Sequence, residues 1–232
     1  MSPYEIDQNI DYRKLQSLSD ELFQFWQGLH AFYLDSVAGF ELVRSRAESS
    51  QIQLKSFTRD SEEDIESLTR SCHFSYAQIF SREFCASGMH RATHGETMER
   101  NSPGGSNYVL LGQLCLVAFS AYWNDYLRKE YVIAKGRLSQ SEADEKIIKG
   151  CLRDNASADL WGDINKLRNS IVHNQGVVSK KYAAFKLIKW FSPGDKISIS
   201  PDQMRAIFIG VLQFRNDLFK EGFPKLYIRI PG

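Results

Sequence analysis

Residues 108–134 read YVLLGQLCLVAFSAYWNDYLRKEYVIA, a strongly apolar and aromatic stretch. Its apolar side chains recur at steps of three and four residues, which is the period of an α-helix. Gly136 follows the stretch, and glycine is common just after the end of a helix. The pattern predicts a central helix, in which the residues at helical steps are Leu111, Leu114, Val117, Ala118, Ala121, Tyr122 and Tyr126.

The sequence on both sides of this stretch also predicts helices. Residues 12–46 contain no proline and repeat apolar residues at helical steps, so a long amphipathic helix is expected there, followed by a polar interval at 47–55. Residues 61–84 begin with a serine and three acidic residues, which is typical of a helix start, and predict one or two helices. Further helices are expected at 139–153, at about 157–175 and at 201–220.

The remaining segments lack helical periodicity. Residues 86–107 hold four glycines and a proline, and predict a long loop. Residues 180–191 fit a helix or a strand, residues 192–195 (SPGD) predict a turn, and residues 197–200 alternate like a short strand. The expected fold is therefore all-α, a single helical domain over 1–232 with at most a small β-hairpin near 186–199.

Composition and charge limit the classes of function. The chain has 232 residues, 43% of them hydrophobic and 25% charged, which is ordinary for a globular protein and excludes collagen-like and mostly disordered chains. Its net charge of +1 excludes a strongly basic nucleic-acid binder. The charge is unevenly spread, however. Residues 1–100 carry 10 basic and 16 acidic side chains, whereas residues 161–232 carry 12 and 5.

The N-terminus and the cysteines predict a cytoplasmic location. The first residues are acidic and lack an apolar stretch, so no secretion signal is expected. The longest apolar-rich run, 109–119, is shorter than the ~20 residues that cross a bilayer, so no membrane partner is expected. Four widely separated cysteines are typical of reduced thiols rather than a disulfide framework. They are Cys72, Cys85, Cys115 and Cys151.

The predicted helix near 157–175 carries the side chains with the most chemical interest. Residues 161–176 read WGDINKLRNSIVHNQG. At about 100° per residue, Arg168 falls within the apolar arc, while Lys166, Asn169 and His173 fall on the opposite face. An ideal helix aims Arg168 and His173 about 140° apart. A shared phosphate would therefore need the reach of the arginine, a distorted helix or a second copy of the chain.

The sequence RNSIVH at 168–173 resembles the Arg-polar-x3-His motif of the HEPN superfamily, whose helical domains occur in bacterial toxins, abortive-infection proteins and CRISPR-associated ribonucleases. The order of predicted helices is also similar, although motif-level identity is confined to about 165–176. The resemblance implies a HEPN-like helical bundle and a metal-independent endoribonuclease. It also implies a homodimer without a cofactor, either a toxin or a phage-defence effector, with RNA as substrate and a cognate antitoxin or regulatory protein as partner.

Under this resemblance each motif residue has a role. His173 would perform acid–base catalysis, Arg168 would bind the phosphate, and Asn169 would orient the phosphate or His173. The structural alternatives are a buried ion pair of Arg168 with a carboxylate such as Asp163, and a helix-capping role for His173. The alternative function is a catalytically silent HEPN-like module that binds a partner protein or nucleotide.

Two other patterns in the sequence involve residue types that bind RNA or metal ions. Lysines interleaved with aromatic residues after the motif predict weak RNA contacts, the alternative being an amphipathic segment with a solvated lysine face. The RNA-contact candidates are Lys166, Lys180, Lys181, Lys186 and Lys189. A second group of residues has zinc-ligand chemistry but fits no usual zinc spacing, so no metal is expected. It comprises Cys72, His73, Cys85, His90 and His94.

Overall fold

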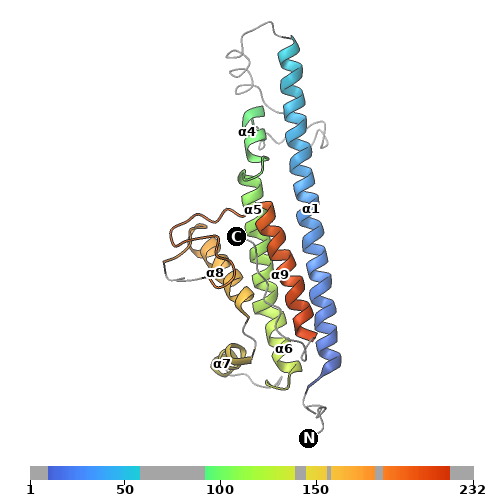
Figure 1. The fold of residues 1–232 in the computed structure, drawn as a ribbon, viewed down its shortest axis with the longest axis vertical. Coiled ribbons are helices and arrows are strands. Elements are labelled where there is room, and N and C mark those ends of the chain that lie inside the picture. Colours follow the sequence, from blue (N-terminus) through green and yellow to red (C-terminus); the bar gives the residue numbers. More distant parts are fainter. Residues whose placement is uncertain (1–9, 58–91, 139–144, 156–157, 181–184, 220–232) are drawn as a thin grey trace. The chain divides into compact units, whose positions relative to one another are not determined.

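The computed structural model describes residues 10–57, 92–138, 145–155, 158–180 and 185–219. These residues are mostly helical and contain no β-strand, which confirms the all-α prediction (Figure 1). None of the described helices is long and apolar enough to cross a membrane. The helices are α1 (Tyr12–Phe57), α4 (His94–Arg100), α5 (Ser106–Ala121), the π-helix η2 (Tyr122–Leu127), α6 (Arg128–Ala134), α7 (Glu145–Asn155), α8 (Asp159–His173) and α9 (Pro201–Phe219).

The chain groups into two compact units. The first comprises residues 1–32, 112–198 and 202–232, and the second comprises residues 33–111 and 199–201. Helices α1 and α5 contribute residues to both units. The motif helix α8 belongs entirely to the first unit, where the candidate site is built. The prediction of a single domain stays a prediction.

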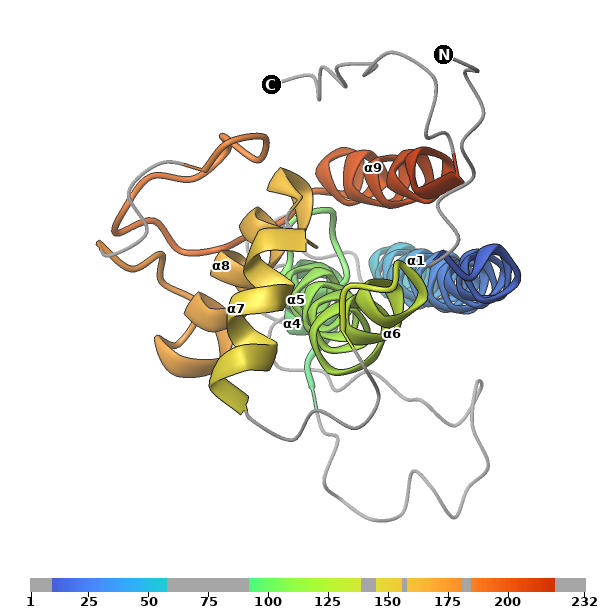
Figure 2. The same cartoon turned by 90° about the horizontal axis from the view of Figure 1, so that it is seen from below.

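Aromatic side chains from successive helices fill the core of the first unit. Phe119 of α5 contacts Phe208 of α9 at a ring-centroid distance of 5.4 Å and Trp161 of α8 at 6.3 Å. Trp161 also stacks on Trp123 at 4.9 Å with nearly parallel rings. Figure 2 shows α7 and α8 to the left of α5, with α9 to its upper right. Because burying such a side chain contributes about 1.5–3 kcal/mol, these contacts hold α8 against the bundle.

The predicted central helix over 108–134 is confirmed as a continuous helical stretch, but it contains a wider turn. Helix α5 passes into the π-helix η2 and then into α6. In η2 the Arg128 N–H donates to the Trp123 carbonyl, five residues back. The Asn124 side chain adds a donor to the Ser120 carbonyl at 2.9 Å, beside this change of pitch. π-Helical turns occur frequently at functional sites.

Helix α1 is longer than predicted. It ends at Phe57 rather than near residue 46, so the prediction of a polar interval at 47–55 is wrong. No glycine or proline interrupts this part, and the Ser49 and Ser50 hydroxyls donate to carbonyls one turn back at 2.9 Å. The polar residues therefore continue the helix rather than end it. The helices predicted at 61–84 lie outside the described residues.

The predicted loop at 86–107 is wrong for residues 94–100, which form α4. Thr93 and Glu96 make a capping box: the Glu96 N–H donates to Thr93 Oγ1 at 3.2 Å, and the Thr93 N–H donates to Glu96 Oε2 at 2.8 Å. A tight turn follows, in which a Cβ on Gly105 would lie 2.3 Å from the Glu99 carbonyl oxygen. Residues 86–91 lie outside the described residues.

Helices α7 and α9 follow their predictions, whereas the predicted hairpin is reduced to a single bridge. Helix α7 (Glu145–Asn155) falls largely within the predicted 139–153, of which residues 139–144 are not described. Helix α9 matches the predicted 201–220 as far as residue 219, where the described residues end. Near the expected hairpin the described residues hold a single antiparallel bridge, between Val177 and Lys196. The alternation at 197–200 instead buries Ile197 and Ile199 in the core without a strand.

Candidate active site at the end of helix α8

Helix α8 confirms the motif helix predicted at about 157–175. Its buried face includes Leu160, Trp161 and Ile164, as the helical wheel predicts. At its C-terminus the Ser170 carbonyl accepts from the N–H groups of Asn174 and Gly176, both at 3.0 Å. Gly176 has φ 77°, in the left-handed region that glycine adopts without strain. The helix therefore ends at His173, as expected from the glycine.

The three motif side chains meet within one chain. Arg168 Nη1 donates to Asn169 Oδ1 at 2.9 Å and lies 3.4 Å from His173 Nε2. The angular separation of about 140° on an ideal helix is bridged by the long arginine side chain. Neither a distorted α8 nor a second copy of the chain is needed to bring Arg168 to His173.

The contact between Arg168 and His173 limits the role of the imidazole nitrogen. A guanidinium has only donors, so a hydrogen bond between the two side chains requires Nε2 to accept from Arg168 Nη1. At 3.4 Å the hydrogen bond is long, so an incoming group displaces it at little cost. His173 is exposed, and Arg168 and Asn169 are half-buried, so the cluster is open to solvent on the side of the imidazole.

Arg168 has no carboxylate partner among the described residues. The alternative of an ion pair with Asp163 is not found, because that carboxylate is occupied elsewhere. Asn169 therefore holds the planar guanidinium of Arg168, and no described side chain neutralises the positive charge of this guanidinium. Such a guanidinium is suited to bind the oxygens of a phosphate in a bidentate way.

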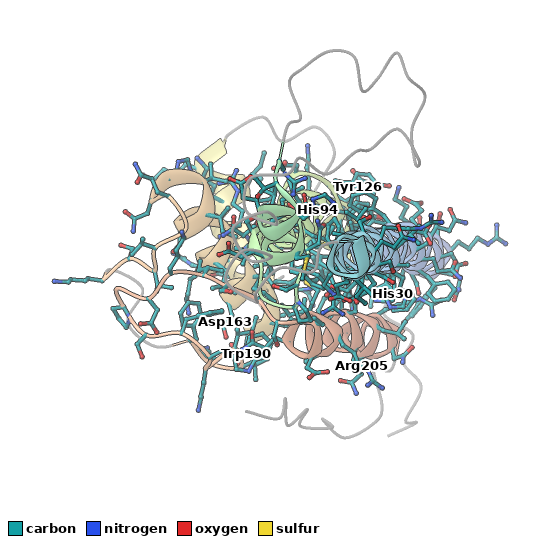
Figure 3. All side chains as sticks on the ribbon, turned by 90° about the horizontal axis from the view of Figure 1, so that it is seen from above. His30, His94, Tyr126, Asp163, Trp190 and Arg205 are labelled. Carbon is teal, nitrogen blue, oxygen red and sulfur yellow. The ribbon has the colours of Figure 1, made fainter. Side chains whose placement is uncertain are left out.

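Asp163 is the polar residue whose importance the sequence did not reveal. Its side chain is fully buried, and Oδ2 accepts from the N–H groups of residues 186, 187 and 188 at 2.8, 2.7 and 3.1 Å. Its second oxygen accepts from Lys166 Nζ at 3.0 Å. Figure 3 shows Asp163 beside the segment that carries Trp190. Asp163 thus anchors the segment after the motif to α8. The available signal was a lone carboxylate at the border of an apolar helix face.

The predicted RNA-binding lysines divide by their contacts. Lys166 is paired with Asp163 and lies 5.5 Å from the centre of the Phe185 ring, so it stabilises the fold. Lys186 Nζ contacts Asp159 at 2.6 Å, and this hydrogen bond raises the pKa of Lys186. Lys180 and Lys189 are exposed, whereas Lys181 lies outside the described residues.

The segment at 180–191, for which both a helix and a strand were considered, forms neither in its described part, 185–191. It is held instead by its backbone N–H groups at the Asp163 carboxylate. Of the five cysteines and histidines at positions 72–94 that have zinc-ligand chemistry, only His94 is among the described residues, and it is buried on α4. Among the residues with defined positions, no group of three or more metal-ligating side chains is found.

The end of α8 therefore offers a cation, an amide and an imidazole nitrogen acceptor within hydrogen-bonding distance of one another. This set can bind a phosphate and accept a proton beside it. In comparisons with known proteins, no family model, curated protein or solved structure matches the chain. The HEPN resemblance stays a prediction based on the motif and the helix order.

Proposed function

We propose that the protein is a metal-independent endoribonuclease of HEPN type that cleaves RNA with Arg168, Asn169 and His173. The observation that supports this most directly is the position of Arg168 Nη1, between Asn169 Oδ1 at 2.9 Å and His173 Nε2 at 3.4 Å. A phosphate-binding group and a proton acceptor next to each other are the two components that RNA cleavage requires, because RNA supplies its own nucleophile.

The chemistry assigns one step to each side chain. The 2′-hydroxyl attacks the adjacent phosphorus, and His173 Nε2 takes its proton as a general base. The 2′-oxygen to phosphorus bond forms, the bond from phosphorus to the 5′-oxygen breaks, and the products are a 2′,3′-cyclic phosphate and a 5′-hydroxyl. Arg168 stabilises the negative charge that develops on the non-bridging oxygens. Asn169 holds the guanidinium in place.

In this proposal the homodimer supplies the second proton transfer. The leaving 5′-oxygen must be protonated. It lies on the side of the phosphorus opposite the attacking 2′-oxygen, so the histidine that accepts the proton of the 2′-hydroxyl does not reach it. The partner's His173, in its protonated form, would act as the general acid across a two-fold axis. Dimerisation is thus needed for the acid, since each chain already brings its own arginine to its own histidine.

We place this activity in the cytoplasm, as that of a toxin or phage-defence effector. A ribonuclease that needs no metal ion is active wherever cellular RNA is present. A cognate antitoxin or regulatory protein would therefore have to inhibit it in the cell that makes it. Induced expression in a bacterial host should arrest growth, and His173→Ala should relieve the arrest. Equal arrest by both forms at equal protein levels would contradict a role of the motif in toxicity.

A cleavage assay tests the activity itself. Purified protein is incubated with RNA in excess chelator, alongside His173→Ala, Arg168→Ala and the control Arg205→Ala, which removes an exposed arginine of α9 (Figure 3). Wild type and control should cleave and leave 5′-hydroxyl ends, whereas the motif variants should not. No cleavage by wild type, or equal cleavage by all forms, would overturn the proposal. Binding of RNA or nucleotide without cleavage would favour the silent module, and cleavage lost only with chelator would require a metal.

A further inference from the structure

A second polar site lies at the opposite end of α8. A cavity of about 130 Å³ opens where the π-helix η2 faces the first turns of α8. This volume corresponds to about four water molecules at ~30 Å³ each and is well below the ~300–1,000 Å³ of a pocket for a whole small molecule. It suits one compact polar group. The lining residues are Trp123, Asn124, Arg128, Arg153, Ala158, Trp161, Gly162 and Asn165.

The charge of the lining is positive. Arg128 and Arg153 both line the cavity, and no carboxylate does. Arg153 Nε contacts Asp154 at 2.9 Å, but both side chains are mostly exposed, so this ion pair neutralises the guanidinium only weakly. Burial lowers the pKa of Arg128, which means that its charge is poorly hydrated. An anion in the cavity would lie close to both positive charges.

Two amides are fixed in the wall of the cavity. Asn165 Oδ1 accepts from Ser120 Oγ and from Asn124 Nδ2, both at 3.3 Å. Asn124 Nδ2 also donates to the Ser120 carbonyl at 2.9 Å. Because its oxygen is held by these donors, the Asn165 amide keeps its N–H groups for another acceptor, and no such acceptor is found among the described residues. A preorganised donor of this kind binds an anion without first having to reorient.

The backbone at the start of α8 adds to this arrangement. The N-cap residue Ala158 makes no side-chain hydrogen bond to the first turn. The first N–H groups of a helix carry a partial positive charge, which favours anions. A Cβ added at Gly162 would meet nothing within 4 Å, so the cavity is open along this side of the helix.

We propose that this cavity binds a phosphate group. The guanidinium forks of two arginines match the oxygens of a tetrahedral phosphate, and the Asn165 amide provides a further donor. The source of the phosphate follows from the direction of α8. Asn165, Asn169 and His173 succeed one another at i+4 steps on one face, which covers about 12 Å at 1.5 Å per residue. An RNA strand along this face would place one phosphate at the active site and another in the cavity; this assignment of the source rests on the proposed function.

Binding measurements test the cavity separately from catalysis. The ligands are inorganic phosphate and a short 2′-O-methyl oligoribonucleotide, which cannot be cleaved because its 2′-oxygen is blocked. The double variant Arg128→Gln, Arg153→Gln should bind both ligands at least tenfold more weakly by calorimetry. The control Arg205→Gln, which removes one charge from the exposed side of α9, should stay within about twofold. Unchanged affinity of the double variant for both ligands would overturn the proposal.

A matched pair at an open position guards against misfolding of the arginine variants. Gly162→Glu and Gly162→Gln place side chains of equal size beside the cavity, where a Cβ meets no other atom. The carboxylate should weaken phosphate binding at least tenfold relative to the amide, because only the carboxylate repels an anion. Equal affinities of the two variants would contradict a phosphate site.

The two ligands also separate the sources of the phosphate. Weakened binding of both the oligonucleotide and phosphate supports an RNA strand that reaches the cavity. Weakened binding of inorganic phosphate alone supports a free phosphate or mononucleotide and overturns the RNA assignment. If wild type binds phosphate in the cavity but fails to cleave unmodified RNA, the proposed function fails while the phosphate site stands.

Discussion

Helix α8 carries two polar clusters that differ in how far their hydrogen-bonding capacity is used. The Asp163 carboxylate is fully buried, and both of its oxygens are occupied, by three backbone N–H groups and by Lys166. The Arg168, Asn169 and His173 cluster is partly exposed and is joined by one good and one long hydrogen bond. The first cluster is satisfied by the fold alone. The second has donors and an acceptor to offer a ligand, which is the property expected of a reactive site.

The largest expected effect comes from Asp163→Ala. The variant leaves three backbone N–H groups and Lys166 without their acceptor, so the free energy of unfolding should fall by about 3–5 kcal/mol. Urea denaturation measures this loss. Asp154→Ala, which removes an exposed carboxylate, should change it by less than about 0.5 kcal/mol. A loss below about 1 kcal/mol for Asp163→Ala would contradict the conclusion that the Asp163 cluster stabilises the fold.

His173→Ala and Arg168→Ala should show the opposite profile. We expect the rate of RNA cleavage to fall by about 10²–10⁴-fold, because an acid–base group or the phosphate ligand is lost. The free energy of unfolding should change by less than about 1 kcal/mol, as is usual for partly exposed residues. Single-turnover kinetics and urea denaturation of the same samples check both. If either variant destabilises the protein as much as Asp163→Ala does, the motif residue has a structural role rather than a catalytic one.

Asn169→Ala should have an intermediate effect. It removes the acceptor that holds Arg168 Nη1 at 2.9 Å while it leaves the guanidinium and the imidazole in place. Loss of a hydrogen bond to a charged group predicts roughly a tenfold lower cleavage rate. Asn169→Asp keeps an acceptor oxygen in place but adds a competing negative charge, so it too should be slower than wild type. Full activity of both variants would exclude a positioning role for Asn169.

The smallest effects are expected when the exposed lysines after α8 are substituted. Lys186→Gln breaks an exposed ion pair with Asp159 and should leave the free energy of unfolding nearly unchanged. If the lysines after α8 follow an RNA backbone, Lys189→Gln should reduce the slope of log affinity against log salt by about 1. Lys186→Gln should reduce it less, because the nearby Asp159 carboxylate partly offsets that charge. Unchanged slopes for both would favour a solvated lysine face.

Periodicity predicted the long helices well. The central stretch was found because it repeats apolar residues over several turns. Helices α8 and α9 were found from residues that are typical of helix starts and ends. Helix α4 was missed because it has only seven residues and is defined by the Thr93 and Glu96 capping box rather than by an apolar face. The end of α1 was misplaced because polar residues were read as a break, although no proline or glycine enforces one.

The candidate site shows a different limit of prediction from the sequence, which concerns contacts rather than helices. The residues of the motif were visible in the sequence, but the contact between Arg168 and His173 depends on side-chain reach, which a helical wheel does not represent. The role of Asp163 depends on N–H groups 23 to 25 residues away, in a segment with no regular structure. Backbone groups carry no signature in the sequence, so tertiary pairing of this kind is found only in the folded chain.

The π-helix η2 accommodates one residue more than a regular helix would hold between α5 and α6. If Tyr122–Leu127 were a regular α-helix of the same length, everything that follows would be rotated by about 100°. Val132 and Ala134, now buried, would turn away from the core, and Arg128 would leave the cavity. Deleting one residue within η2 would instead allow a regular α-helix that presents the same faces, so a single-residue deletion here should be tolerated better than a single-residue insertion, which would shift the register of α6.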